Sequence, residues 1–96
     1  MALEALVLHP KDNVATAVYH LEKGQRISLK DGGKDHDVLL IQTIPFGHKF
    51  ALKNIKPGEK IIKYGEVIGQ ATAKINKGEH VHVHNVEGLR GRGDRQ

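Results

Sequence analysis

Apolar and polar residues alternate over short stretches of this chain, which is typical of β-strands. Residues 5–9 predict a first strand that ends before Pro10, because proline has no N–H to donate to a strand ladder. Residues 26–30 and 38–43 predict a hairpin, and the sequence Asp-Gly-Gly-Lys at residues 31–34 predicts its turn.

The second half of the chain follows the same pattern. Residues 60–64 and 67–69 predict two further strands joined by a bend at Gly65 and Glu66. Residues 80–86 begin by alternating histidine with valine, which predicts a last strand. The chain as a whole is therefore expected to be mainly β.

One short helix is expected between the first strand and Gly24. Asp12 or Asn13 is a plausible N-cap, and Gly24 suits the left-handed position that follows a helix end. The apolar residues between them recur at helical spacing: Val14, Ala17, Val18 and Leu21.

A repeated spacing of small, branched and glycine residues occurs in three segments. They are Ala17-x3-Leu21-x2-Gly24-x2-Ile27, Ala51-x3-Ile55-x2-Gly58-x2-Ile61 and Ala71-x3-Ile75-x2-Gly78-x2-Val81. The spacing predicts one helical turn, then a glycine with positive φ, then an inward-facing residue that opens a strand. Glycine corners between short strands predict a β-clip or a barrel-like roll rather than a flat sheet.

The length and composition limit the classes of protein that fit. The chain's 96 residues suffice for one small domain, but they are too few for the layers and cleft of most complete enzymes. The chain has no cysteine, which excludes a thiolate site and fits a cytoplasmic location, and it has no apolar run that could span a membrane. Residues 1–90 are expected to form the domain, and residues 91–96 a flexible basic tail.

The formal charge of +4 does not indicate a nucleic-acid partner, because acidic residues are interspersed among the lysines. The basic segment at residues 90–95 has no aromatic residue that could stack on a base. Diffuse positive charge is better suited to an anionic small molecule or to an acidic surface of a partner protein.

The strongest candidate for chemistry is the run of histidines at every second position, His80, His82 and His84. In a straight strand the three rings would share one face, and Val81 and Val83 would pack into the core. Imidazole is a ligand of divalent transition metals and a proton acceptor near neutral pH. Residues two apart in a strand are separated by roughly 6.6 Å. Only a neighbouring pair such as His80 and His82 can therefore hold one ion, with further ligands from elsewhere; the alternative is a solvent-facing strand without a ligand.

Two further clusters are candidates for the same site. His48 could act as base or ligand, and Lys49 could bind a carboxylate, so these two join His82 and His84 as candidate catalytic residues. The alternative is a turn with two solvated side chains.

Candidate substrate contacts are Lys63 and Tyr64, which precede a predicted bend, and Asn85, which follows the histidine run. For Lys63 and Tyr64, the alternative is a solvated lysine followed by a half-buried tyrosine that belongs to the core.

Several segments resemble the SAF domain of altronate dehydratase, and together they extend over roughly residues 5–90. They are Asp12-Asn13-Val14-Ala15-Thr16-Ala17, Gly47-His48-Lys49-Phe50-Ala51-Leu52, Ile62-Lys63-Tyr64-Gly65, Ile68-Gly69 and Gly78-Glu79-His80-Val81-His82-Val83-His84-Asn85. The resemblance implies a β-clip fold, similar to type III antifreeze proteins and to the C-terminal domain of sialic acid synthase.

The resemblance also implies an activity. It implies dehydration of a sugar acid such as D-altronate to 2-keto-3-deoxy-D-gluconate with iron(II) or manganese(II), in an enzyme completed by a large dehydratase subunit or domain. Galactarate dehydratase and sulfolactate sulfo-lyase are similar, so a sulfo-lyase small subunit is an alternative. A SAF module that binds a carbohydrate or a protein without catalysis is another, and a homo-oligomer is compatible with either.

Overall fold

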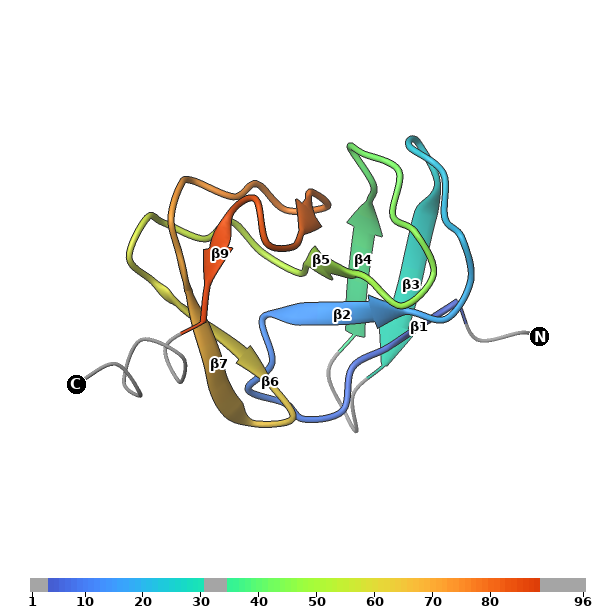
Figure 1. Ribbon diagram of the computed structural model, residues 1–96. Helices are drawn as coiled ribbons and strands as arrows, with labels where there is room; N and C mark the ends of the chain where they lie inside the picture. Colours follow the sequence, from blue (N-terminus) through green and yellow to red (C-terminus); the bar gives the residue numbers. More distant parts are fainter. Residues whose placement is uncertain (1–3, 31–34, 89–96) are drawn as a thin grey trace.

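Antiparallel strands form all the regular structure in residues 4–30 and 35–88, which are the residues that the computed structural model describes (Figure 1). The mainly β prediction is confirmed. The predicted turn at residues 31–34 and the predicted tail at residues 91–96 lie outside the described residues.

The strands form three antiparallel sheets. The central sheet has the order β1 (Ala5–Leu6), β2 (Val14–Ala17), β5 (Lys49–Ala51) and β8 (His80–Val81). The second is the hairpin of β3 (Arg26–Lys30) and β4 (Asp35–Leu39). The third has the order β6 (Lys60–Lys63), β7 (Glu66–Ala71) and β9 (Val86–Glu87). Figure 1 shows β2 running between the β3–β4 hairpin and the third sheet.

The core is divided into two clusters because successive side chains of a strand point in opposite directions. Ala15 and Ala17 of β2 join Phe50 in the cluster beneath β3 and β4. Val14 and Ala51 join the cluster beneath β6 and β7. The central strands thus hold the two flanking sheets together.

The predicted short helix is wrong, because residues 14–17 form strand β2. Asp12 and Asn13, predicted as helix N-caps, are buried and bind the β6–β7 hairpin instead. Asp12 Oδ1 accepts the N–H of Gly65 at 2.8 Å. The Asn13 amide accepts the N–H of Ile62 at 2.8 Å and donates to the carbonyl of Lys60 at 2.9 Å. These long-range bonds hold the chain extended where the local spacing favours a helix.

The repeated segments form corners of one shape, and the structure contains a fourth copy that the sequence pattern alone did not indicate. Its residues are Leu40, Ile44, Gly47 and Phe50, with the same intervals. The four glycines at the corners have φ between 83° and 91°: Gly24, Gly47, Gly58 and Gly78. The predicted positive φ at Gly24, Gly58 and Gly78 is confirmed, but the predicted helical turn is wrong, since each segment is an open bend.

The corners associate in two reciprocal pairs. In the first pair, Leu21 and Ile44 exchange both backbone hydrogen bonds, at 2.9 and 2.8 Å. In the second, Ile55 and Ile75 do the same at 2.7 and 2.9 Å. The first pair lines one core cluster and the second pair lines the other, so the domain has an internal two-fold pattern.

Candidate metal and substrate site

Strand pairing brings two distant histidine segments together at one edge of the central sheet. Strands β5 and β8 are antiparallel, with Lys49 opposite Val81 and Phe50 opposite His80. His48 immediately precedes β5, and His82 immediately follows β8. Residues more than 30 positions apart therefore share one surface.

The three imidazoles form a stack. The ring centroids of His48 and His82 are 4.0 Å apart, and the rings are inclined by 16°. His48 Nδ1 and His80 Nε2 are 2.8 Å apart and share a hydrogen bond, so one of the two nitrogens carries the proton. His84 lies at the margin of the cluster, with its ring tilted by 39° against that of His80.

The corner before β5 leaves the His48 side chain free for this cluster. In the other three corners, the residue equivalent to His48 caps the bend. Its side-chain oxygen accepts the backbone N–H of the residue three positions earlier. These bonds run from Glu22 to Gln25, from Lys56 to Glu59 and from Asn76 to Glu79. The corner that carries His48 has Pro45 at the donor position. Because proline has no N–H, this corner needs no acceptor at residue 48.

A tight turn fixes the other two rings. The N–H of Asn85 donates to the carbonyl of His82 at 3.1 Å. The Asn85 side chain, 3% exposed, accepts the N–H of His82 at 3.0 Å and donates to the carbonyl of His80 at 2.9 Å. Gln42 Oε1 accepts the N–H of His80 at 2.9 Å, a contact that no local sequence signal indicated.

This turn corrects two predictions. The predicted strand at residues 80–86 ends at Val81 and resumes only at Val86. Val81 is buried as predicted, but Val83 is 82% exposed and does not pack into the core. Because both polar groups of the Asn85 amide bind the backbone, the geometry favours a positioning role for Asn85 over the predicted contact with substrate.

The electrostatics of the cluster favour neutral imidazoles. Burial lowers the pKa of His80, and the neighbouring charges lower it further: His48, His84, His82 and Lys49. Burial and then the charge of His48 also lower the pKa of His82. The pKa of Lys49 is lowered by burial and, to a smaller extent, by the charge of Lys63.

The donor set suits a divalent transition metal. One ligand nitrogen from each of His48, His80 and His82 lies within 4.8 Å of the others. Two nitrogens that bind one ion at about 2.1 Å are at most about 4.2 Å apart, so binding would draw the widest pair closer. His82 Nδ1 is buried without a hydrogen-bond partner, as expected of a nitrogen kept for a ligand. The predicted pair His80 and His82 thus gains His48 as a third donor.

Lys63 is the last residue of β6, and Tyr64 is the first residue of the turn of the β6–β7 hairpin. The Lys63 amine is 4.8 Å from the centre of the Tyr64 ring, and Tyr64 is 54% exposed rather than part of the core. Tyr64 has φ of 58° and Gly65 has φ of 74°, as a two-residue hairpin turn requires. Asparagine is the usual residue at the first of these positions, so an exposed tyrosine there is consistent with a binding role.

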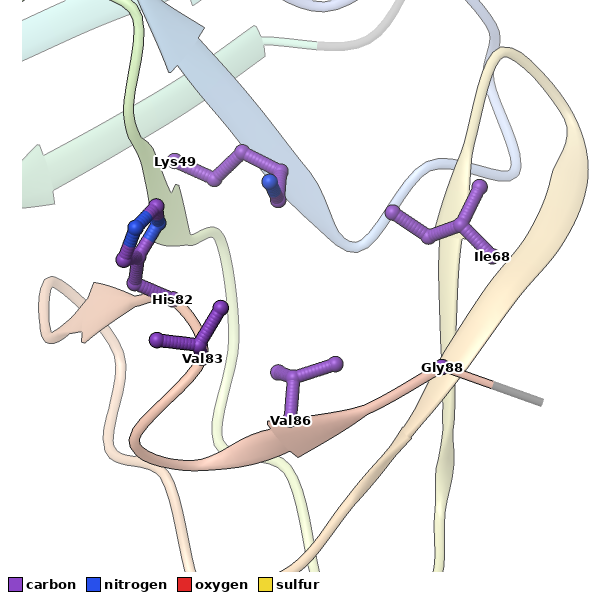
Figure 2. A pocket seen from close by; sticks show the side chains of 6 residues that line it. All are labelled: Lys49, Ile68, His82, Val83, Val86 and Gly88. Atoms are coloured by element: carbon purple, nitrogen blue, oxygen red, sulfur yellow. The ribbon is translucent and has the colours of Figure 1, made fainter. Parts of the chain in front are cut away.

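A pocket of about 240 Å³ opens beside the imidazole cluster (Figure 2). It is lined by Lys49, Ile68, His82, Val83, Val86 and Gly88. Figure 2 shows Lys49 and His82 on one side of the pocket and Ile68 of β7 on the other. The predicted candidates Lys49 and His82 therefore face a common space. The structure does not place His84 or Asn85 in the lining.

The fold and the site define a small all-β domain that presents imidazoles and a lysine beside an open pocket. The chain belongs to the family of the altronate/galactarate dehydratase SAF domain, whose sequence profile matches residues 3–89. The resemblance noted from the motifs is thereby confirmed.

Three relatives illustrate the range of the family. Altronate dehydratase of Escherichia coli (strain K12) is 42% identical over 83 residues, which are 86% of this chain and 16% of that enzyme. Altronate dehydratase of Bacillus subtilis (strain 168) is 39% identical over 80 residues, 83% of this chain and 15% of that enzyme. Subunit alpha of the (2R)-sulfolactate sulfo-lyase of Chromohalobacter salexigens is 34% identical over 90 residues, 91% of this chain and 96% of that subunit.

The chain therefore spans less than one fifth of these two altronate dehydratases, but nearly all of the sulfo-lyase subunit. Within the described residues, no helix is long and apolar enough to cross a membrane.

Proposed function

We propose that this chain is the SAF component of a sugar-acid dehydratase, which eliminates water from an aldonate such as altronate to give a 2-keto-3-deoxy acid. The larger part of the enzyme, a second subunit or the remainder of one polypeptide, would supply the rest of the active site. Family membership and the small share of the altronate dehydratases that the chain covers support this division.

The observation that carries the proposal is the convergence of His48, His80 and His82 beside Lys49. Dehydration requires a base to remove the proton next to the carboxylate, while hydroxide leaves from the adjacent carbon and the resulting enol becomes a 2-keto acid. A neutral imidazole nitrogen can accept or return a proton near pH 7. The Lys49 amine can neutralise the substrate carboxylate, with Lys63 and Tyr64 as further contacts.

We further propose that His80, His82 and His48 hold iron(II) or manganese(II) jointly with residues of the larger part. Three imidazole nitrogens would leave coordination positions for a partner's carboxylates and for substrate oxygens. When bound, the ion would act as a Lewis acid toward the negative charge that develops on the substrate. His84, at the margin of the cluster, remains a candidate for proton transfer.

The test is a coupled 2-keto acid assay on the complete enzyme with altronate and added iron(II) or manganese(II). His82→Ala should abolish turnover, because it removes a nitrogen that faces the pocket, while the far-UV circular dichroism spectrum stays unchanged. His20→Ala, at an exposed site, is the matched control and should retain activity. An unchanged kcat in His82→Ala would refute the role of this residue.

A second candidate keeps the same elimination but expels sulfite from sulfolactate. It is favoured by the match to nearly the full length of a sulfo-lyase subunit alpha. Assaying the complete enzyme with altronate, galactarate and sulfolactate decides between the two candidates. Turnover of none of these substrates by an intact complex would favour a binding module without catalytic activity.

A further inference from the structure

Apart from Lys49 and His82, the side chains that line the pocket are apolar. They consist of Ile68, Val83 and Val86, with Gly88 at the end of the described chain. Val83 is 82% exposed and Ile68 is 36% exposed. The turn that Asn85 closes thus holds an exposed apolar side chain directly beside the imidazole cluster.

A sugar acid does not account for these walls. Such a substrate carries a hydroxyl on most of its carbons, and hydroxyls that lose water need hydrogen-bond partners. Ile68, Val83 and Val86 offer none from their side chains. The pocket has room for an apolar side chain, since a cavity of roughly 150 Å³ can hold a benzene ring.

We propose that the dehydratase polypeptide inserts an apolar side chain between Val83 and Ile68, and that this contact closes the imidazole site. The inference rests on the proposed function, because it identifies how the larger part of that enzyme meets this domain. It assigns Val83, Ile68 and Val86 to the interface, and it leaves Lys49 and His82 to the substrate.

The identity of the occupant follows from the relatives and from the position of the pocket. Altronate dehydratases contain a much longer polypeptide besides the matched domain, and the sequence profile of the domain ends at residue 89. Gly88, which lines the pocket, is the neighbour of that boundary. Because the matched domain is N-terminal in the altronate dehydratases, the rest of such a polypeptide would continue from this domain close to the pocket.

The experiment places the photoreactive residue p-benzoylphenylalanine at position 83 of the complete enzyme, purified from its source with all its parts. The control carries it at position 39, because Leu39 is 45% exposed on β4 of the separate hairpin. After irradiation, peptide mapping should find position 83 joined to a dehydratase sequence outside residues 1–96, and position 39 not joined to it. Adducts to a second copy of this domain, equal adducts from both positions, or no adduct from position 83 would overturn the proposal.

A pair of substitutions gives a second measurement. Val83→Asp should lower the fraction of assembled enzyme and reduce kcat/KM by about tenfold or more, as expected for the centre of an interface. Leu39→Asp should stay within about twofold of the parent. Normal assembly and kcat/KM in Val83→Asp would count against the docking contact.

The two proposals can fail separately. If the enzyme forms the adduct at position 83 but does not dehydrate a sugar acid, the docking contact is supported and the proposed function is refuted. If the enzyme dehydrates altronate but does not form that adduct, the proposed function is supported and the docking contact is refuted.

Discussion

Burial is the largest cause of the lowered pKa values of His80 and His82, and the positive charge of their neighbours adds to it. The two rings are therefore neutral under conditions in which a solvent-exposed histidine is partly charged. Neutral rings suit both metal binding and proton acceptance. The lowered pKa values should also make the folded protein less stable at acidic pH.

The free energy of unfolding of the metal-free protein should decrease as the pH falls below about 6.5. The unfolded chain then takes up protons that His80 and His82 of the folded protein bind only at lower pH, and the decrease should stop below the folded pKa values of these two residues. Urea denaturation on both sides of this pH measures the effect. The double variant His80→Gln/His82→Gln should flatten the dependence, and His20→Gln should not. An equally steep dependence in the double variant would contradict this explanation.

Asn85 has its effect through the backbone of the two histidines that it binds. Asn85→Ala leaves the His82 N–H and the His80 carbonyl without their partner, so it should cost about 1–3 kcal/mol in the free energy of unfolding. Asn54 also accepts a backbone N–H, but at an exposed position, and Asn54→Ala should cost less than about 0.5 kcal/mol. If Asn85 had no positioning role, urea denaturation would give equal decreases in the free energy of unfolding for the two variants.

The four corners show that elements of one shape can differ in function. All four share the bend and the glycine, but only the corner at residues 40–50 combines a proline with a histidine. Because Pro45 has no N–H, this corner needs no capping side chain, and His48 occupies the position that the capping residue has in the other corners. The site is thus a local variation on a structural repeat.

The corner glycines separate the effect of backbone strain from that of packing. Gly58 has φ of 85°, and a methyl group added there would meet open space, so Gly58→Ala should cost roughly 1–2 kcal/mol for strain alone. At Gly78, which has the same φ, a methyl group would overlap the Leu39 carbonyl oxygen. Gly78→Ala should therefore cost a further 1–3 kcal/mol or so for overpacking. Equal decreases in the free energy of unfolding, measured by urea denaturation, would show that the close packing of Gly78 does not contribute to stability.

The predictions from sequence were most accurate where local interactions decide the structure. The strand at residues 26–30 was placed correctly because its apolar residues alternate and its partner is nearby in the chain. The helix at residues 14–21 was wrong because apolar residues four apart also fit the corner repeat. The deciding hydrogen bonds come from Asp12 and Asn13 to a hairpin about 50 residues away.

At the scale of the molecule, the site depends on pairings that no short segment reveals. His48 and the histidine run were each identified from sequence, but their contact requires the β5–β8 pairing. The fourth corner held part of the missing signal, since His48 follows its glycine by one residue and His80 follows the glycine of an equivalent corner by two. Val83 was misplaced because strand alternation was extended through the turn that Asn85 closes.

The domain presents its chemistry at an open edge rather than in an enclosed cleft. The imidazole cluster, Lys49 and the apolar walls of the pocket all lie on the side formed by β5, β7, β8 and the turn before β9. This arrangement agrees with relatives in which the domain is a small part of a larger enzyme or a separate subunit.

The central claim is that His48, His80 and His82 together hold one divalent ion in the complete enzyme. It is tested most directly by titrating manganese(II) into the metal-free complete enzyme and following the free ion by electron paramagnetic resonance. His48→Gln is the most informative variant, because glutamine occupies the equivalent corner position at Gln25 and the fold should be retained. We expect one tightly bound ion in the parent enzyme and in His20→Gln, and a loss of affinity of about tenfold or more in His48→Gln. Equal affinity in all three proteins would contradict the claim.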